Sequence, residues 1–275
     1  MIEIPESLTI AKQLNETVRG KKIIEAEAAH TPHSFAWYSG EPDFYARVMA
    51  GKEVGEATGI GSMIELSLGD YSFVVGDGAN VRYLASGTKL QERYQTRITF
   101  EDDSHLVCTV QMYGAMFLVE PEKYQNPYYL VAKEKPLPGT EDFTYQYFKS
   151  LREDVSGTLS MKGFLATEQR IPGLGNGVLQ DILLEAGVHP KRKIGTLTES
   201  HWKRIYEVVV GTLDKMTAAG GRDTEKDLFG EKGGYQTMLS KKTVGKPCLY
   251  CGNLIQKASY MGGTVYFCPV CQEIG

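Results

Sequence analysis

Residues 169–190 read QRIPGLGNGVLQDILLEAGVHP, a glycine-rich turn that leads into a helix. Gly187 stands where helices end in a left-handed residue, and Pro190 follows where the helix cannot continue. We expect the turn to leave backbone N–H groups from Gly173 to Asn176 unpaired at the start of the helix, and such an end attracts phosphate. A bare G-x-G pattern is weak evidence for any one ligand. A dinucleotide site is excluded because no strand precedes the turn and no third glycine falls in place.

Two C-x2-C pairs lie near the C-terminal end with sixteen residues between them, Cys248 with Cys251 and Cys268 with Cys271. At this spacing four thiolates can surround one Zn2+ tetrahedrally if a hairpin brings the pairs together. Such a site has no open position for water, so the sequence predicts one structural zinc that folds a segment too small for its own core. Two disulfides are the alternative, which a chain without a secretion signal does not favour. The fifth cysteine, Cys108, is interpreted as a small buried hydrophobe in a strand.

Composition excludes several classes of protein. Hydrophobic residues make up 42% of the 275 residues and charged residues 23%, which is ordinary for a globular chain and excludes disorder throughout. No run of about eighteen apolar residues occurs, so no membrane-spanning helix is expected. The first residues, MIEIPE, have neither the basic region nor the apolar core of a signal peptide. We therefore expect a cytoplasmic protein.

The net charge of −4 hides an asymmetry along the chain. From Gly187 onward there are 13 Lys and Arg against 8 Asp and Glu, whereas the preceding residues carry 17 against 26. This difference is either an ordinary fluctuation of surface charge or a sign that contact with a polyanion concentrates in the C-terminal part.

The pattern of apolar residues predicts a β-rich N-terminal region followed by helices. Residues 1–16 are expected to begin with a helix, and turns separate the strands expected after it at 22–27, 63–68, 71–75, 96–100 and 105–110. Strands at this spacing favour an antiparallel sandwich or barrel of about 120 residues. Proline-rich residues 125–139 are interpreted as a linker. Helices are expected after it at 143–151, 177–186 and 201–219, the last with Thr198 as its N-cap.

Taken together, these motifs resemble the formamidopyrimidine-DNA glycosylase/endonuclease VIII family of base-excision repair enzymes. Residues 173–176 and 186–190 are similar to the helix–two-turn–helix motif of that family. Its C-terminal zinc finger is matched by residues 233–236, by Pro247 with Cys248, and by 267–272. The start MIEIPE and the surroundings of Gly114 also resemble family segments. The resemblance runs the length of the chain and is strongest from Gly163 onward.

The resemblance implies an α+β multidomain fold. A β-sandwich with flanking helices would cover residues 1–130, a helix–two-turn–helix domain 137–240, and a zinc-finger β-hairpin 245–275. The implied partner is double-stranded DNA, damaged or abasic. The counterpart of Asn176 contacts a phosphate, which Gly175 would help to present, although Asn176 could instead merely cap the turn. Lys191, Arg192 and Lys193 would suit backbone phosphates, or they form a solvated basic stretch.

The chain departs from the family pattern at the residues that carry its chemistry. The family nucleophile is an N-terminal proline, and this sequence has Ile2 there. Met1 is then expected to stay, so the only α-amine is a primary one. Glu3 matches the catalytic glutamate, or it serves only as a helix-start carboxylate, and Glu6 matches a further acidic position. Other family side chains fall on smaller residues here: a lysine on Ser62, a stack-filling methionine near Ala79, a loop arginine near Ala115, and the zinc-hairpin arginine on Gly263 or Thr264.

Three functions fit these observations. The first is binding of damaged or distorted DNA without efficient cutting. The second is an active DNA glycosylase with altered chemistry, which uses the amine of Met1 or a water activated by Glu3. The third is a zinc-ribbon module that binds proteins and has no role with DNA.

Overall fold

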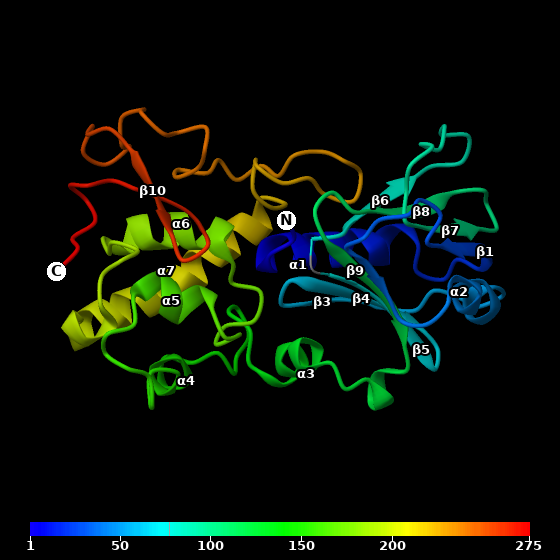
Figure 1. Cartoon of the computed structure of the whole chain (residues 1–275), viewed down its shortest axis with the longest axis horizontal. Coiled ribbons are helices and arrows are strands. Elements are labelled where there is room, and N and C mark those ends of the chain that lie inside the picture. Colours follow the sequence, from blue (N-terminus) through cyan, green and yellow to red (C-terminus); the bar gives the residue numbers. More distant parts are fainter. Residues whose placement is uncertain (77) are drawn as a thin grey trace. The chain divides into compact units, whose positions relative to one another are not determined.

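The computed structural model describes residues 1–76 and 78–275 (Figure 1). The chain forms two compact units, one of Met1–Leu130 with Gly220–Gly234 and one of Val131–Ala219 with Tyr235–Gly275. A segment from the C-terminal third therefore belongs to the N-terminal unit, while both cysteine pairs belong to the second unit. The domain boundaries expected from the sequence do not set this segment apart, and they stay a prediction.

Two sheets form the frame of the first unit. The four-stranded sheet has the order β1-β7-β8-β6, with bounds Ile23–Ala28, Thr96–Phe100, His105–Thr109 and Asn80–Leu84. The five-stranded sheet has the order β2-β9-β5-β4-β3, with bounds Ala36–Tyr38, Gly114–Val119, Tyr71–Gly76, Met63–Leu68 and Ala57–Ile60. Neighbouring strands are antiparallel except for β2 and β9, which are parallel. The expected β-sandwich is confirmed, as separate sheets rather than a barrel.

The core of the first unit lies where both sheets turn apolar side chains toward two helices. Phe73 from one sheet and Phe100 from the other belong to a single buried cluster. Helix α1, Ile4–Thr17, adds Ile10 and Leu14 to it and packs against β3 and β4. A Cβ on Gly59 of β3 would lie 2.9 Å from the carbonyl of Ser7, so glycine lets the start of the helix approach the sheet.

Two further helices of the N-terminal half were not expected from the sequence. Helix α2, Pro42–Met49, packs against β1, and its eight residues are too few for a clear periodic pattern. Helix α3, Pro127–Glu134, lies inside the expected linker 125–139, and the boundary between the two units, after Leu130, falls in the same segment. Proline is compatible with a helix start, which explains why a proline-rich stretch contains a helix. A 3-10 turn, η1, precedes it at Pro121–Lys123.

The second unit is built around helices α4 Tyr145–Ser150, α5 Met161–Ala166, α6 Asn176–Ala186 and α7 Glu199–Ala218, with a 3-10 turn, η2, at Ile194–Thr196. Helices α4, α6 and α7 fall where the sequence predicts them, and α5 was missed. Thr198 caps α7 by accepting the N–H of His201, as expected. Gly187 ends α6 in the left-handed region with φ +71°, which also confirms its expected role.

The C-terminal hairpin pairs β10, Gln256–Tyr260, with β11, Gly263–Phe267. Met261 and Gly262 both have positive φ, as a tight two-residue hairpin turn requires. Strand β11 packs against α6, so the hairpin and the helix after the glycine turn form one structure. Among the described residues, no helix has the length and apolar character that crossing a membrane requires.

Candidate nucleic-acid interface and metal centre

The first residues of the chain form the start of α1. Ile2 is 6% exposed and belongs to the core cluster of the first unit. Glu3 and Glu6 form a capping box, in which each side chain accepts the backbone N–H of the other residue. The helix-start role of Glu3, one of the two readings of the sequence, is therefore seen directly.

Arg222 lies in the segment Gly220–Gly234 of the first unit, and its side chain contacts Glu3 and Glu6 at the start of α1. It is 2% exposed, and Glu3 and Glu6 are also buried. Its Nε and Nη2 donate to the two carboxylate oxygens of Glu6 at 3.0 and 2.7 Å, a bidentate pairing. Its Nη1 lies 3.4 Å from a carboxylate oxygen of Glu3. Burial lowers the pKa of Arg222, but Glu3 and Glu6 raise that pKa by more, so the guanidinium stays charged.

The loop that carries Arg222 is pinned at two places. A Cβ on Gly233 would lie 2.1 Å from the carbonyl carbon of Gly221, so the two ends of the loop cross at a distance that only glycine permits. Farther along, Gln13 of α1 donates to the Asp227 carboxylate and accepts the N–H of Leu228. Arg222 was not expected from the sequence, where its only signal is its position directly after two glycines.

Met1 lies at the edge of a cavity of about 660 Å³ in the first unit. Its α-amine forms an ion pair with Glu225, and its side chain is about half exposed. The cavity lining also contains the cations Arg82, Lys89 and Lys226. The lining of the cavity therefore combines these cations with the α-amine of Met1 and the carboxylate of Glu225.

The positions where family side chains were expected are mostly closed to a ligand. Ala79 is fully buried in the core, and Ala115 is a buried residue of β9 rather than part of a loop. Ser62 lies in the turn between β3 and β4. The exposed tip before β9 is instead Met112, 71% exposed, which also lines the cavity. Ala79 and Ala115, the positions expected to carry family side chains, are therefore buried and do not lie on a surface that a ligand can reach.

The glycine turn and the zinc-type hairpin meet at the start of α6. Gly175 is the N-cap and Asn176 the first helical residue. The side-chain Nδ2 of Asn176 donates to the carbonyl of Thr264 at 3.0 Å, while its Oδ1 is buried without a hydrogen-bond partner. The N–H of Leu174 donates to Ile171, so this group is not left unpaired as the sequence analysis expected. A tight turn closes on itself before the helix begins.

The three basic residues after the motif have different surroundings. The ammonium of Lys191 lies over the ring of Tyr260, and Lys193 is exposed. Arg192 is 7% exposed, donates to Thr196, and lies 3.8 Å from a carboxylate oxygen of Glu273. Lys191 and Lys193 can thus reach a solvent-borne anion, whereas Arg192 is held within the unit.

One further cation, which the sequence gives no reason to expect, lies beside the hairpin. Lys162 of α5 is 4% exposed, and its ammonium donates to the carbonyl of Tyr260 at 2.7 Å. The ammonium would be 3.3 Å from a Cβ on Gly263, so the glycine of the hairpin leaves room for it. Burial lowers the pKa of Lys162. Only the folded chain brings this residue to the hairpin.

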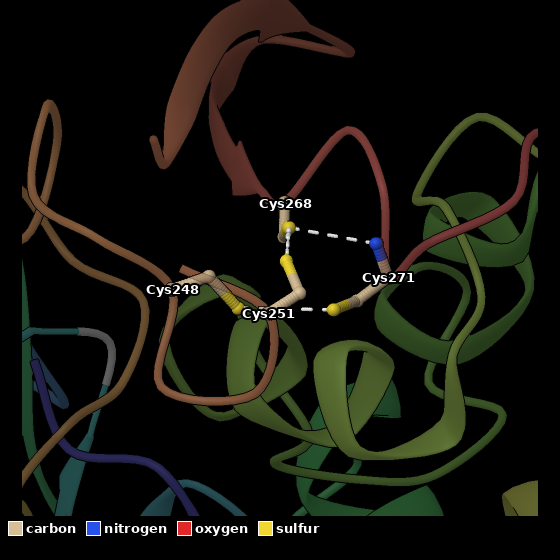
Figure 2. A group of neighbouring side chains, drawn as sticks. All are labelled: Cys248, Cys251, Cys268 and Cys271. Carbon is tan, nitrogen blue, oxygen red and sulfur yellow. Dashed lines mark hydrogen bonds between the residues drawn. The ribbon is translucent and has the colours of Figure 1, made fainter. Parts of the chain in front are cut away.

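Cys248, Cys251, Cys268 and Cys271 converge at the base of the hairpin. Figure 2 shows their sulfur atoms turned toward a common centre, and all four lie within 4.8 Å of one another. The Sγ–Sγ distances of 3.4 and 3.8 Å are too long for disulfide bonds, so that alternative is excluded. Sulfurs around one Zn2+ lie about 3.8 Å apart, given Zn–S bonds of about 2.3 Å. The cluster therefore fits a four-thiolate metal site.

Comparison with known proteins points to one family, although no protein-family model matches the chain. The chain is 25% identical to formamidopyrimidine-DNA glycosylase of Lactococcus lactis subsp. lactis, over 99% of this chain and all of that one. It is 27% identical to the protein of the same name from Streptococcus pneumoniae serotype 4, over 99% of both.

Solved structures agree with this similarity. Lactococcus lactis Fpg in complex with DNA containing an abasic site has a TM-score of 0.84 at 25% identity, over 98% of this chain and 99% of that one. The same enzyme bound to DNA with N7-benzyl-Fapy-dG has a TM-score of 0.85 at 25% identity and the same coverage. Two sheets, a glycine-led helix and a four-cysteine hairpin thus define a protein with a DNA glycosylase fold. Along its whole length the chain is similar to proteins named formamidopyrimidine-DNA glycosylase (Fpg/MutM).

Proposed function

We propose that this protein binds damaged or distorted double-stranded DNA without the efficient base excision and strand cleavage of its family. Binding is supported by the relatives, whose solved structures contain DNA with an abasic site or a modified base. It is also supported by the start of α6, where Asn176 meets the hairpin. Two cations follow that helix: Lys191, whose ammonium lies over the ring of Tyr260 in the hairpin, and the exposed Lys193.

The observation that carries the loss of efficient chemistry is the position of Ile2. A secondary amine is required where the family has proline, but here the side chain of Ile2 is buried in the core. The α-amine then belongs to Met1 and is paired with Glu225. An amine held as an ammonium cannot attack a sugar carbon, because its lone pair is occupied by a proton.

The metal is assigned a structural role in this proposal. Cys248, Cys251, Cys268 and Cys271 would hold Zn2+ as four thiolates. When bound, the ion supplies a cross-link and no open coordination position. The residues around it do the binding: Asn176 is held against the hairpin, and Gly175 begins the helix whose positive end faces a phosphate.

Two measurements test the proposal. We expect duplexes that contain an abasic site to bind, with an affinity that falls steeply between about 50 and 200 mM salt as phosphate contacts are lost. We also expect no covalent adduct when the same complexes are treated with borohydride. An affinity that does not change with salt would contradict phosphate contact and leave the zinc-ribbon protein-interaction module as the better interpretation.

An active glycosylase remains a second candidate because Met1 lines the cavity of about 660 Å³. If its amine loses a proton, the nitrogen can bond to C1′ while the C1′–N bond to the base breaks. The base leaves with the electron pair and takes a proton from solvent, and the adduct then opens to an imine that borohydride reduces. An adduct at Met1, located by peptide mass analysis, would favour this candidate. Base release without an adduct would point instead to water activated by Glu3.

A further inference from the structure

We propose that Arg222 is a positioning residue that keeps Glu3 from acting as a general base. The inference rests on the proposed function, since it assigns to one residue a large share of the suppressed chemistry. It concerns the cluster of Glu3, Glu6 and Arg222, in which the sequence singles out the two glutamates but not the arginine. The cluster lies entirely within the first unit.

Geometry ties both carboxylates to one guanidinium. Glu6 receives two hydrogen bonds from the side chain of Arg222 and a third from its backbone N–H at 3.2 Å. Glu3 faces Nη1 with one oxygen, and its side chain accepts the backbone N–H of Glu6. Nη2 also contacts the carbonyl of Met1 at 3.4 Å. The guanidinium thereby connects the first residue of the chain with both carboxylates.

A general base needs an oxygen that can take a proton from a water at the reacting carbon. The side chain of Glu3 is 8% exposed, and taking up a proton there removes its attraction to Arg222. Separating a buried ion pair carries a large penalty because one charge is left without a partner. We expect the resulting suppression of base removal to be roughly 100-fold.

Arg222 cannot turn away from the carboxylates without moving its loop. Gly221 and Gly233 cross at backbone contact on one side of it. On the other side, Leu228 is fully buried in the core and is held by the side chain of Gln13. The position of the guanidinium is therefore set by packing as well as by charge.

Freeing Glu3 would permit hydrolysis without a covalent intermediate. The oxygen of a water bonds to C1′ while its proton passes to the Glu3 carboxylate, and the C1′–N bond breaks with its electron pair going to the base. The base takes a proton from solvent. The products are a free base and an abasic site, and the strand stays intact until alkali is added.

The test uses the full-length zinc-loaded protein with Arg222→Gln and Glu6→Gln combined. This pair removes one charge of each sign, so the cluster keeps its net charge and the variant is expected to fold. Duplexes containing 8-oxoguanine or a formamidopyrimidine serve as probes in single-turnover reactions at saturating protein. We expect alkali-dependent cleavage about 100-fold faster than with the unchanged protein. Adding Glu3→Gln should return the rate to the original level, and Arg97→Gln, another ion-paired arginine of the first unit, should leave it unchanged.

Three results would overturn the inference. One is a double variant that binds DNA normally and releases base no faster than the original protein. Another is base release by the unchanged protein that Glu3→Gln abolishes, since Glu3 would then work with Arg222 in place. The third needs no DNA. A water-soluble carbodiimide should label Glu3 in the double variant and not in the original protein. Equal labelling of the two proteins would contradict the proposal that Arg222 restrains Glu3. Loss of DNA binding in the unchanged protein counts against the proposed function, while the labelling experiment still decides the role of Arg222.

Discussion

Two clusters of interacting side chains organise this protein, and they differ in how they can be recognised. At the base of the hairpin, four cysteines come from two short C-x2-C segments. At the start of α1, Glu6 meets Arg222 from 216 residues away. The spacing of residues along the chain predicts a metal site, because each C-x2-C segment places two thiolates close together. A buried ion pair has no spacing rule, so only the folded chain reveals it.

The two units also differ in whether their features relate to DNA binding or to the excision chemistry. The second unit has the cysteine pairs and the glycine turn that the resemblance is based on, and the structure joins them through Asn176 and Thr264. The first unit has Ile2 in the core and a guanidinium on the two glutamates. This difference supports the proposal that the protein binds DNA while its excision chemistry is suppressed.

Removing the metal should give the largest effect. Structural Zn2+ in small modules contributes apparent free energies of about 10–16 kcal/mol, so residues 245–275 should lose hydrogen-exchange protection when a chelator is added. DNA affinity should fall at the same time. Cys251→Ser should lower the metal content, whereas Cys108→Ser, in the other unit, should not. A hairpin that stays protected after the metal has gone would contradict a structural role.

Arg222→Leu should destabilise the first unit by about 3–5 kcal/mol, because Glu3 and Glu6 would stay buried without a cation. Urea unfolding measures the loss, and hydrogen exchange of the α1 amides locates it. Arg97→Leu is the control, since its partners Glu25 and Glu27 are exposed or half-buried and such a pair contributes at most about 1 kcal/mol. Equal losses in the two variants would mean that the cluster at the helix start has no special energetic weight.

Asn176→Ala should weaken binding to abasic DNA by about 10- to 100-fold, since a hydrogen bond to a charged group contributes about 1.5–3 kcal/mol. The slope of affinity against salt should stay the same because asparagine carries no charge. Lys193→Ala should instead reduce that slope by about one. If Asn176→Ala binds as tightly as the original protein at matched salt, the role of this residue is limited to holding the hairpin.

The smallest effect is expected at Glu199, at the start of α7. Hydrogen bonds from Tyr145, Lys149 and Arg152 lower the pKa of Glu199 from 4.5 to about 2. A carboxylate with a lowered pKa in the folded state stabilises it above the unfolded pKa, and the contribution is lost as the pH falls through 4.5 toward 2. The difference in melting temperature between the protein and Glu199→Gln should therefore shrink between pH 6 and pH 2.5. Glu207→Gln, an exposed position on the same helix, should show no comparable trend.

Much of the secondary structure follows from local pattern. Strands β1, β4, β5, β7 and β8 and helices α1, α4, α6 and α7 lie where alternation or helical spacing predicts them. Helices α2, α3 and α5 were missed, and their six to eight residues give little room for a period to show, although α4 was found at six residues. Proline at the start of α3 also suggested a linker, although proline fits the first turn of a helix.

The sequence by itself determined the sulfur cluster, the glycine turn before α6 and the alternating strands, because each of these depends on residues close together along the chain. Only the tertiary structure decided that a loop near residue 222 closes on the first helix, that Lys162 reaches the hairpin, and that Arg192 is held inside its unit. Side-chain pairing over such separations depends on how the elements pack, and no spacing in a single sequence records it.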